Sequence, residues 1–149
     1  IGMLPRAEAF RQRLATIAPR LPISQDCSVA EGFSNLEVAF LSAAMVDDTV
    51  ETAALRALVK GARLAVVTMG GDGVYASDGV HRWQLPALPI QPVDATGAGD
   101  AFMAGYISGF LATGEVSTAL DTGVRQGAFA CTFQGGWPQT PEDRAAAAG

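Results

Sequence analysis

The sequence predicts an α/β fold built on a mainly parallel sheet. Residues 36–42 form an apolar segment, and residues 63–68 are apolar on both faces, which is typical of strands at the buried centre of a parallel sheet. Residues 46–62 lie between them with a helical pattern, and parallel neighbours need such a crossover. The dipeptide Asp78-Gly79, between two short β-rich segments, adds a hairpin.

The first third of the chain predicts a helix followed by a strand. Phe10, Leu14 and Ile17 recur at helical spacing within residues 5–18, so we expect them to form the apolar face of an amphipathic helix. Two prolines end this helix. Residues 21–28 then form a short strand.

The middle of the chain predicts a helix, a glycine turn and the hairpin. Within residues 46–62 the acidic residues come early and the basic ones late, as the helix dipole favours, and Gly61 is a suitable C-terminal stop. A glycine turn at residues 69–73 follows the second apolar strand. Residues 74–77 and 80–85 are the two hairpin strands.

The last third predicts an extended segment and two helices. Residues 85–95 are extended and interrupted by prolines, residues 98–113 form an apolar helix that ends near Gly114, and Ser117 is expected to cap a helix over 118–133. Small residues in this last helix allow close packing: Gly123, Gly127, Ala128 and Ala130.

Composition excludes several classes of protein. The 149 residues are 49% hydrophobic and 17% charged, which excludes a disordered chain. The net charge is −5 and the ten basic residues are scattered, so no nucleic-acid partner is expected. The longest apolar run, residues 101–112, is too short to span a membrane. Cys27 and Cys131 lack metal-binding spacing and are expected to be reduced thiols of a cytoplasmic protein.

The stretch of residues 92–102, PVDATGAGDAF, carries the strongest chemical signal. Gly97, Ala98 and Gly99 let a ligand approach the backbone, and N–H groups at a helix start attract phosphate. Asp100, in the same turn, can accept a proton from a hydroxyl. The alternative is a glycine turn in which the aspartate only caps the helix.

This stretch resembles the signature of the ribokinase (pfkB) family of carbohydrate kinases. The family pattern is Asp, any residue, Thr-Gly-Ala-Gly-Asp, then Ala or Ser and Phe, and residues 94–102 match it throughout. The resemblance implies a ribokinase-like three-layer α/β/α fold, with Asp100 as catalytic base and Gly97–Gly99 lining the anion hole. Many members hold a monovalent cation such as K⁺ near the first Asp and Thr, here Asp94 and Thr96.

A second glycine loop, TMGGDGV at residues 68–74, follows an apolar strand, where open α/β sheets bind ligands. It resembles the nucleotide loop of the same family, which implies that Thr68, Gly70 and Gly73 contact ATP. The alternative is a tight connection between the strand and the hairpin, which needs glycines without any ligand.

The sequence departs from the family where Mg²⁺ is organised. Many members carry Asn-any-any-Glu on the strand before the nucleotide loop, whereas residues 42–45 here read Ser-Ala-Ala-Met. An earlier frame, residues 34–37, supplies Glu37 without the Asn. No metal-organising residue is assigned, and we expect the nucleotide phosphates and water to hold the Mg²⁺.

The resemblance implies an ATP-dependent sugar kinase acting on a primary hydroxyl of a carbohydrate. Short stretches, among them QGAFACTFQGGW, are similar to fructosamine and fructoselysine-type 6-kinases. We expect residues 1–149 to be a single α/β domain, the nucleotide- and phosphate-binding C-terminal half of a longer kinase that forms a homodimer. The alternatives are a nucleoside or vitamin-alcohol kinase of the same fold, or a nucleotide-binding module without catalysis.

Overall fold

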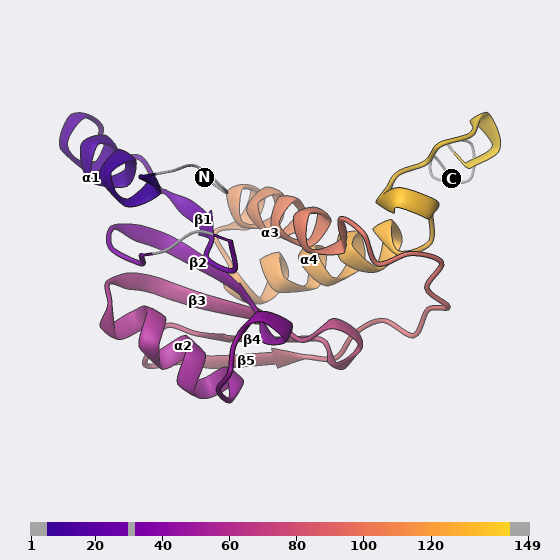
Figure 1. The fold of residues 1–149 in the computed structure, drawn as a ribbon, viewed down its shortest axis with the longest axis horizontal. Coiled ribbons are helices and arrows are strands. Elements are labelled where there is room, and N and C mark those ends of the chain that lie inside the picture. Colours follow the sequence, from indigo (N-terminus) through magenta and orange to yellow (C-terminus); the bar gives the residue numbers. More distant parts are fainter. Residues whose placement is uncertain (1–5, 30–31, 144–149) are drawn as a thin grey trace. The chain divides into compact units, whose positions relative to one another are not determined.

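The computed structural model describes residues 6–29 and 32–143 of the chain (Figure 1). The contacts between residues divide the chain into two compact units. One comprises Ile1–Gly70 with Val74–Gln84 and carries the sheet, and the other comprises Gly71–Gly73 with Leu85–Gly149 and carries two long helices. The expectation of a single domain over residues 1–149 stays a prediction.

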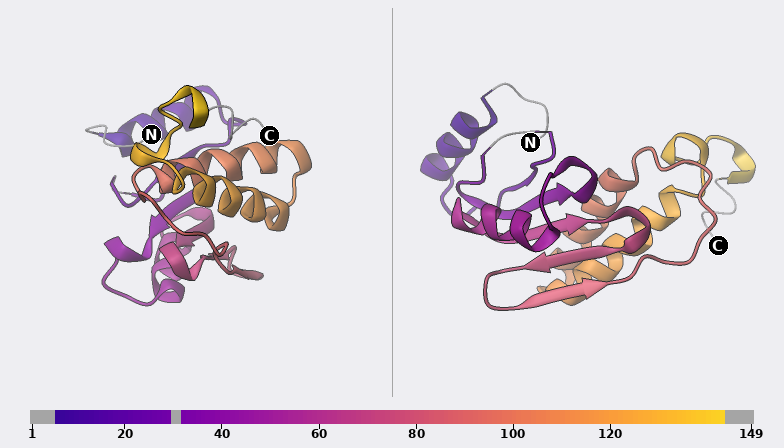
Figure 2. Two further views of the ribbon diagram at one scale, coloured as in Figure 1. Left: turned by 90° about the vertical axis from the view of Figure 1, so that its right-hand side faces the viewer. Right: turned by 60° about the horizontal axis from the view of Figure 1, so that its bottom comes forward.

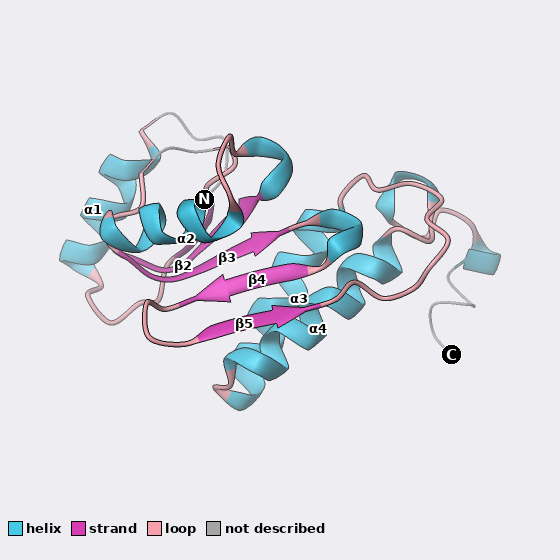
Figure 3. Cartoon of the chain, turned by 90° about the horizontal axis from the view of Figure 1, so that it is seen from below, coloured by secondary structure: helices cyan, strands magenta, loops and turns pink. Residues whose placement is uncertain are grey.

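The first unit is built on a five-stranded mixed sheet with strand order β1-β2-β3-β4-β5, of which Figure 3 labels β2 to β5. β1, β2 and β3 are parallel, and β4 runs antiparallel to β3. This confirms the predicted α/β fold with its added hairpin. The elements, in chain order, are α1 (Ala7–Ile17), β1 (Ser24–Asp26), β2 (Leu36–Ser42), the 3₁₀ turn η1 (Ala43–Met45), α2 (Val50–Val59), β3 (Ala62–Thr68), η2 (Gly70–Asp72), β4 (Val74–Ser77) and β5 (Arg82–Leu85).

Helix α2 is the crossover between β2 and β3. Its N-cap is Thr49, whose side chain accepts a hydrogen bond from the Thr52 N–H at 3.3 Å, and Gly61 follows its end at φ 109°. The alanine face of the helix, Ala54 and Ala57, is buried in one core cluster with sheet residues such as Val67. Small side chains let this helix lie close to the sheet.

Helix α1 is present as predicted, but its expected apolar face is confirmed only in part, because Leu14 packs against the core cluster and the other two residues do not. Phe10 and Ile17 are exposed, whereas Arg11 is fully buried. The guanidinium of Arg11 donates to the Gln25 side chain and to the Ser34 carbonyl oxygen, the latter at 3.2 Å. A buried guanidinium needs such acceptors, and residues distant in the chain supply them here.

The second unit is a pair of antiparallel helices, α3 (Ala98–Thr113) and α4 (Val116–Ala130), followed by the turn η3 (Gln134–Gly136) (Figure 2). Glycines let the helices touch: a Cβ on Gly123 would lie 2.9 Å from the Phe102 ring. The predicted close packing of the last helix is therefore confirmed. Its predicted cap was wrong, because α4 begins two residues earlier than expected, with Glu115 at the N-cap and no side-chain capping bond.

Two smaller findings concern the thiols and the helices of the described residues. Cys27 and Cys131 are both half-buried free thiols, as predicted. Across residues 6–29 and 32–143, the structure contains no helix of the length and hydrophobicity that a membrane span requires.

Candidate active site

The start of α3 is open to a ligand. Gly97 is the N-cap residue with φ 75° and ψ 0°, a left-handed conformation that favours glycine. A Cβ placed on Gly97 or Gly99 would meet no atom within 4 Å, so the backbone here can be approached closely. Asp100, the third helical residue, is exposed. The predicted anion-hole residues and the predicted base therefore lie in one accessible turn.

The N–H groups of this turn are not all equivalent. The first four N–H groups of a helix have no acceptor within the helix, and they belong here to Gly97, Ala98, Gly99 and Asp100. The Ala98 N–H, however, donates to the Ala95 carbonyl oxygen at 3.2 Å. We therefore expect the other three donors to contribute most to an anion site.

Asp94 lies at the centre of a hydrogen-bond network that joins two segments of the second unit. Its Oδ1 accepts from the Thr96 N–H at 2.9 Å, and its Oδ2 accepts from the Gly135 N–H at 2.8 Å and from Gln134 Nε2 at 2.9 Å. The Thr96 and Gly135 N–H donors lower the pKa of the Asp94 carboxyl below its ordinary value. Sequence reasoning missed Gln134 and Gly135 as site residues, although their QGG stretch belonged to the noted resemblance.

This network does not fit a monovalent cation at Asp94 and Thr96. An N–H donor presents positive charge to the oxygen that it contacts, and Asp94 Oδ2 already receives two. Gly136 lies against the carbonyl oxygen of Thr96, since a Cβ added to Gly136 would lie only 2.1 Å from it. The sequence-based assignment of these two residues to a cation stays a prediction, and the geometry favours another role for Asp94.

The glycine loop after β3 has a mixed character. Gly70, at φ 57°, and Gly71 have no atom within 4 Å of an added Cβ, so this part of the loop is open. Gly73 is buried, and its Cβ would lie 2.0 Å from the Leu85 carbonyl oxygen. Thr68 is half-buried and its hydroxyl donates to the Leu41 carbonyl oxygen at 3.3 Å. Local packing thus accounts for Gly73, whereas Gly70 remains available to a nucleotide.

The residues considered for Mg²⁺ lie at opposite ends of the sheet. Ser42 pairs in register with Thr68 at the carboxyl ends of β2 and β3, and the η1 residues that follow include no acid. Glu37 lies near the start of β2, where Arg63 contacts it at 3.3 Å. In the described part of the chain no three His, Cys, Asp or Glu side chains gather as a metal site. Glu37 is therefore excluded from the end of the sheet that carries the glycine loop.

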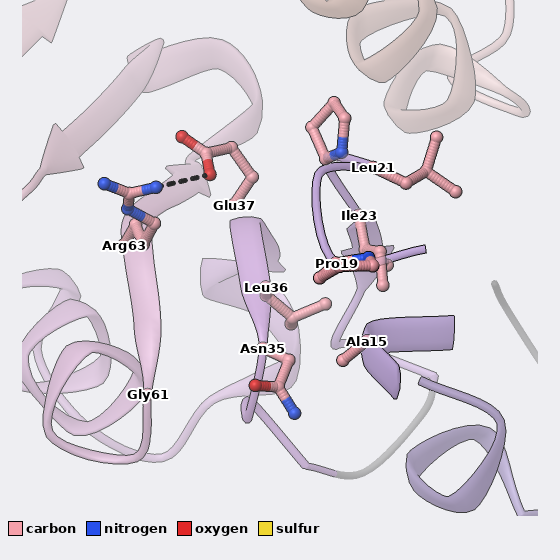
Figure 4. A pocket seen from close by; sticks show the side chains of 10 residues that line it. Ala15, Pro19, Leu21, Ile23, Asn35, Leu36, Glu37, Gly61 and Arg63 are labelled. Atoms are coloured by element: carbon pink, nitrogen blue, oxygen red, sulfur yellow. Dashed lines mark hydrogen bonds and ion pairs between the residues drawn. The ribbon is translucent and has the colours of Figure 1, made fainter. Parts of the chain in front are cut away.

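Glu37 and Arg63 instead line a pocket of about 300 Å³ at the amino ends of the strands (Figure 4). Figure 4 shows the Arg63 guanidinium pointing at the Glu37 carboxylate, with Leu36 next to Glu37 on the same strand and Ile23 on a neighbouring segment. Because ligands of open α/β sheets bind at the carboxyl ends of strands, this pocket is not the expected nucleotide site.

Three other polar residues have local roles. Asp26 Oδ1 accepts from the Ser28 N–H at 2.9 Å and so caps the turn after β1. In the hairpin, Asp78 pairs with His81 at 3.0 Å, and this contact, together with the His81 and Val80 N–H donors, lowers the pKa of the Asp78 carboxyl to about 2. Burial raises the pKa of the Cys27 thiol to about 11, so the group stays a thiol at neutral pH.

The fold is shared with solved kinase structures. The crystal structure of a ribokinase from Thermotoga maritima aligns with 92% of this chain and 52% of its own, with a TM-score of 0.76 and 21% identity. The fold is therefore ribokinase-like. The chain belongs to the pfkB family of carbohydrate kinases, whose family model matches residues 35–143.

Individual relatives act on different acceptors. The chain is 32% identical over 103 residues to fructoselysine 6-kinase of Escherichia coli. This match covers 69% of this chain and 40% of that protein. It is 51% identical over 53 residues to cytidine kinase of Thermococcus kodakarensis, covering 34% of this chain and 19% of that protein. The predicted family is confirmed, and the chain spans about 40% of the length of the first relative.

Proposed function

We propose that this chain carries the phosphate-transfer site of an ATP-dependent carbohydrate kinase that phosphorylates a primary hydroxyl. The observation that carries the proposal is the open first turn of α3, where exposed Asp100 stands among N–H groups that no helical carbonyl accepts. Membership of the pfkB family supports the reaction class.

The chemistry follows from these groups. Asp100 accepts the proton of the acceptor hydroxyl while the hydroxyl oxygen attacks the γ-phosphorus, and the bond from that phosphorus to the β,γ-bridging oxygen breaks to release ADP. The N–H groups of Gly97, Gly99 and Asp100, with the positive end of α3, stabilise the charge on the transferred phosphoryl group. Mg²⁺, when bound to the nucleotide phosphates, neutralises part of their charge.

We assign the nucleotide side to the loop after β3. Gly70 has the space for close approach, and Thr68 ends the strand at the carboxyl edge of the sheet. Gly73 supports this loop through its packing against Leu85. Among residues 6–29 and 32–143, no group of three His, Cys, Asp or Glu side chains adds a metal site to this assignment.

The test is a phosphorylation assay on the complete protein that carries this chain. Wild type and Asp100→Asn are incubated with ATP, Mg²⁺ and a panel of acceptors that includes fructosamines, free pentoses and hexoses, cytidine and a vitamin alcohol. We expect ADP release with a carbohydrate acceptor and its loss in the variant. Turnover of the variant at the wild-type rate would exclude Asp100 as the base.

Two alternatives are outcomes of the same panel. A nucleoside kinase is favoured by the 51% identical match to cytidine kinase, and cytidine as the preferred acceptor would establish it. Tight ATP binding without phosphorylation of any acceptor, a vitamin alcohol included, would establish a nucleotide-binding module. A homodimer and a cytoplasmic location stay predictions, and light scattering in solution tests the first.

A further inference from the structure

The hydrogen bonds around Asp94 connect the phosphate loop to a turn forty residues away. Two backbone hydrogen bonds hold the main chain just before the loop. The Val93 and Asp94 N–H groups both donate to the Cys131 carbonyl oxygen, at 2.8 and 3.2 Å. The Asp94 carboxylate then binds the Gly135 N–H and the Gln134 side chain. The end of α4 and the turn after it therefore hold the segment that leads into α3.

The donors at Asp94 occupy most of the carboxylate positions at which a cation would bind. A carboxylate oxygen offers about two lone-pair sites, and the two N–H donors to Oδ2 fill both. Oδ1 binds the Thr96 N–H, which turns the chain toward Gly97. Gly136, at φ 69°, lies against the Thr96 carbonyl oxygen so closely that no side chain fits there. The carboxylate charge is thus balanced by amide dipoles of the protein.

We infer that Asp94 and Gln134 form a clamp that positions the Gly97–Asp100 phosphate loop without a monovalent cation. Asp94 is a positioning residue, since its carboxylate binds Thr96, Gln134 and Gly135 and acts through the loop that follows it. The predicted effect of the clamp on catalysis rests on the proposed function. The predicted effects on stability and on ion dependence do not rest on it.

The first test measures ion dependence. Melting temperatures of the complete protein are compared in KCl, NaCl and choline chloride at equal ionic strength, and crystals soaked in RbCl are examined for anomalous scattering. We expect equal melting temperatures and no rubidium peak at Asp94. A rise specific to K⁺ that Asp94→Asn abolishes, or a rubidium peak within contact distance of this carboxylate, would overturn the clamp.

The second test removes one donor. Gln134→Ala should lower the melting temperature by about 2–4 °C, the scale of one lost hydrogen bond in a protein of this size. Amide exchange of the peptides around Thr96 and Gly135 should become faster. Gln12→Ala is the matched control, because Gln12 is exposed on α1 in the other unit. Unchanged exchange and melting in Gln134→Ala would contradict the clamp.

Exchanging the hydrogen-bond donor and acceptor between residues 94 and 134 distinguishes a positioning role in catalysis from a purely structural role. Asp94→Asn alone turns an amide NH₂ toward the donors of Gln134 and Gly135, so we expect kcat to fall on the order of 10- to 100-fold with little change in KM for the acceptor. The double variant Asp94→Asn with Gln134→Glu restores one bond with donor and acceptor exchanged. It should recover at least part of kcat, and no recovery would overturn the positioning role.

The two proposals fail in distinguishable ways. If the melting and exchange results follow the clamp but no acceptor is phosphorylated, the proposed function fails and the clamp stands. If an acceptor is phosphorylated while turnover and melting temperature both rise specifically with K⁺, the clamp fails and the proposed function stands.

Discussion

The two glycine loops of this chain, Thr68–Gly73 and Asp94–Asp100, use the same residue type for different physical reasons. In the first loop, buried Gly73 is required because Leu85 occupies the space of a side chain. In the second loop, Gly97 and Gly99 face open space, so no packing contact excludes a side chain at either position. A glycine required by a packing contact and a glycine that faces open space look identical in a sequence, although Gly97 is also favoured by its φ of 75°. Only the surroundings of each distinguish the two.

The largest expected difference between the loops is chemical. Asp100→Asn should lower kcat about 10²- to 10⁴-fold, as expected for loss of a general base, because the amide cannot accept the hydroxyl proton. Steady-state kinetics of the complete protein measure it. Stability should change by no more than about 0.3–1 kcal/mol, since Asp100 is exposed and contributes mainly through the helix dipole. A comparable loss of kcat from a substitution at buried Gly73 that left folding intact would break the comparison.

The next largest effect concerns the packing of the first loop. Gly73→Ala should destabilise the protein by several kcal/mol, because its φ of 99° and the contact with Leu85 both oppose a side chain, each costing about 1–3 kcal/mol. Gly71→Ala is the matched control in the same loop, as no atom lies within 4 Å of its added Cβ. Urea unfolding of both variants measures the difference. Equal stabilities would show that the loop is not held against Leu85.

A smaller effect should appear in the second loop. Gly99→Ala should leave stability unchanged or raise it by up to about 1 kcal/mol, because alanine is the better helix former and meets no neighbour. The added methyl group should nevertheless raise KM for ATP, since it occupies ligand space. Thermal unfolding and kinetics together test this. Loss of stability without a change in KM would place Gly99 with the packing glycines.

The smallest effect is a pH dependence of the second loop. The folded-state pKa of Asp94 lies below its ordinary value of 3.8, with the Thr96 N–H as the first cause. A carboxyl group with a lowered pKa stabilises the folded state above about pH 4. The folded state loses this stabilisation as the pH falls further and the carboxylate is protonated. The difference in melting temperature between wild type and Asp94→Asn should therefore become smaller as the pH is lowered from about 5 to about 3, the range in which an aspartate carboxyl titrates. A difference that stays constant over this range would contradict the charge-dependent clamp.

Much of the fold could be predicted because its signals are local. The apolar strands β2 and β3, the Asp78-Gly79 hairpin and both ends of α3 follow from the residue types within each segment. The start of α4 could not be predicted from Ser117, because the two-residue link after α3 and the packing of the helix pair decide where α4 begins. The candidate site is predicted from a single stretch, in which the glycines and Asp100 stand together, and the roles of these residues stay predictions.

By itself the sequence determined the order of the elements, the family and the stretch that carries the proposed chemistry, since each is written in contiguous residues. Only the tertiary structure decided that Arg11 is buried, that Gly73 is a packing glycine and that Asp94 is bound by Gln134 and Gly135. The physical reason is the same in each case. The partner that satisfies the charge or fills the space is distant in the chain, and only folding brings it within contact.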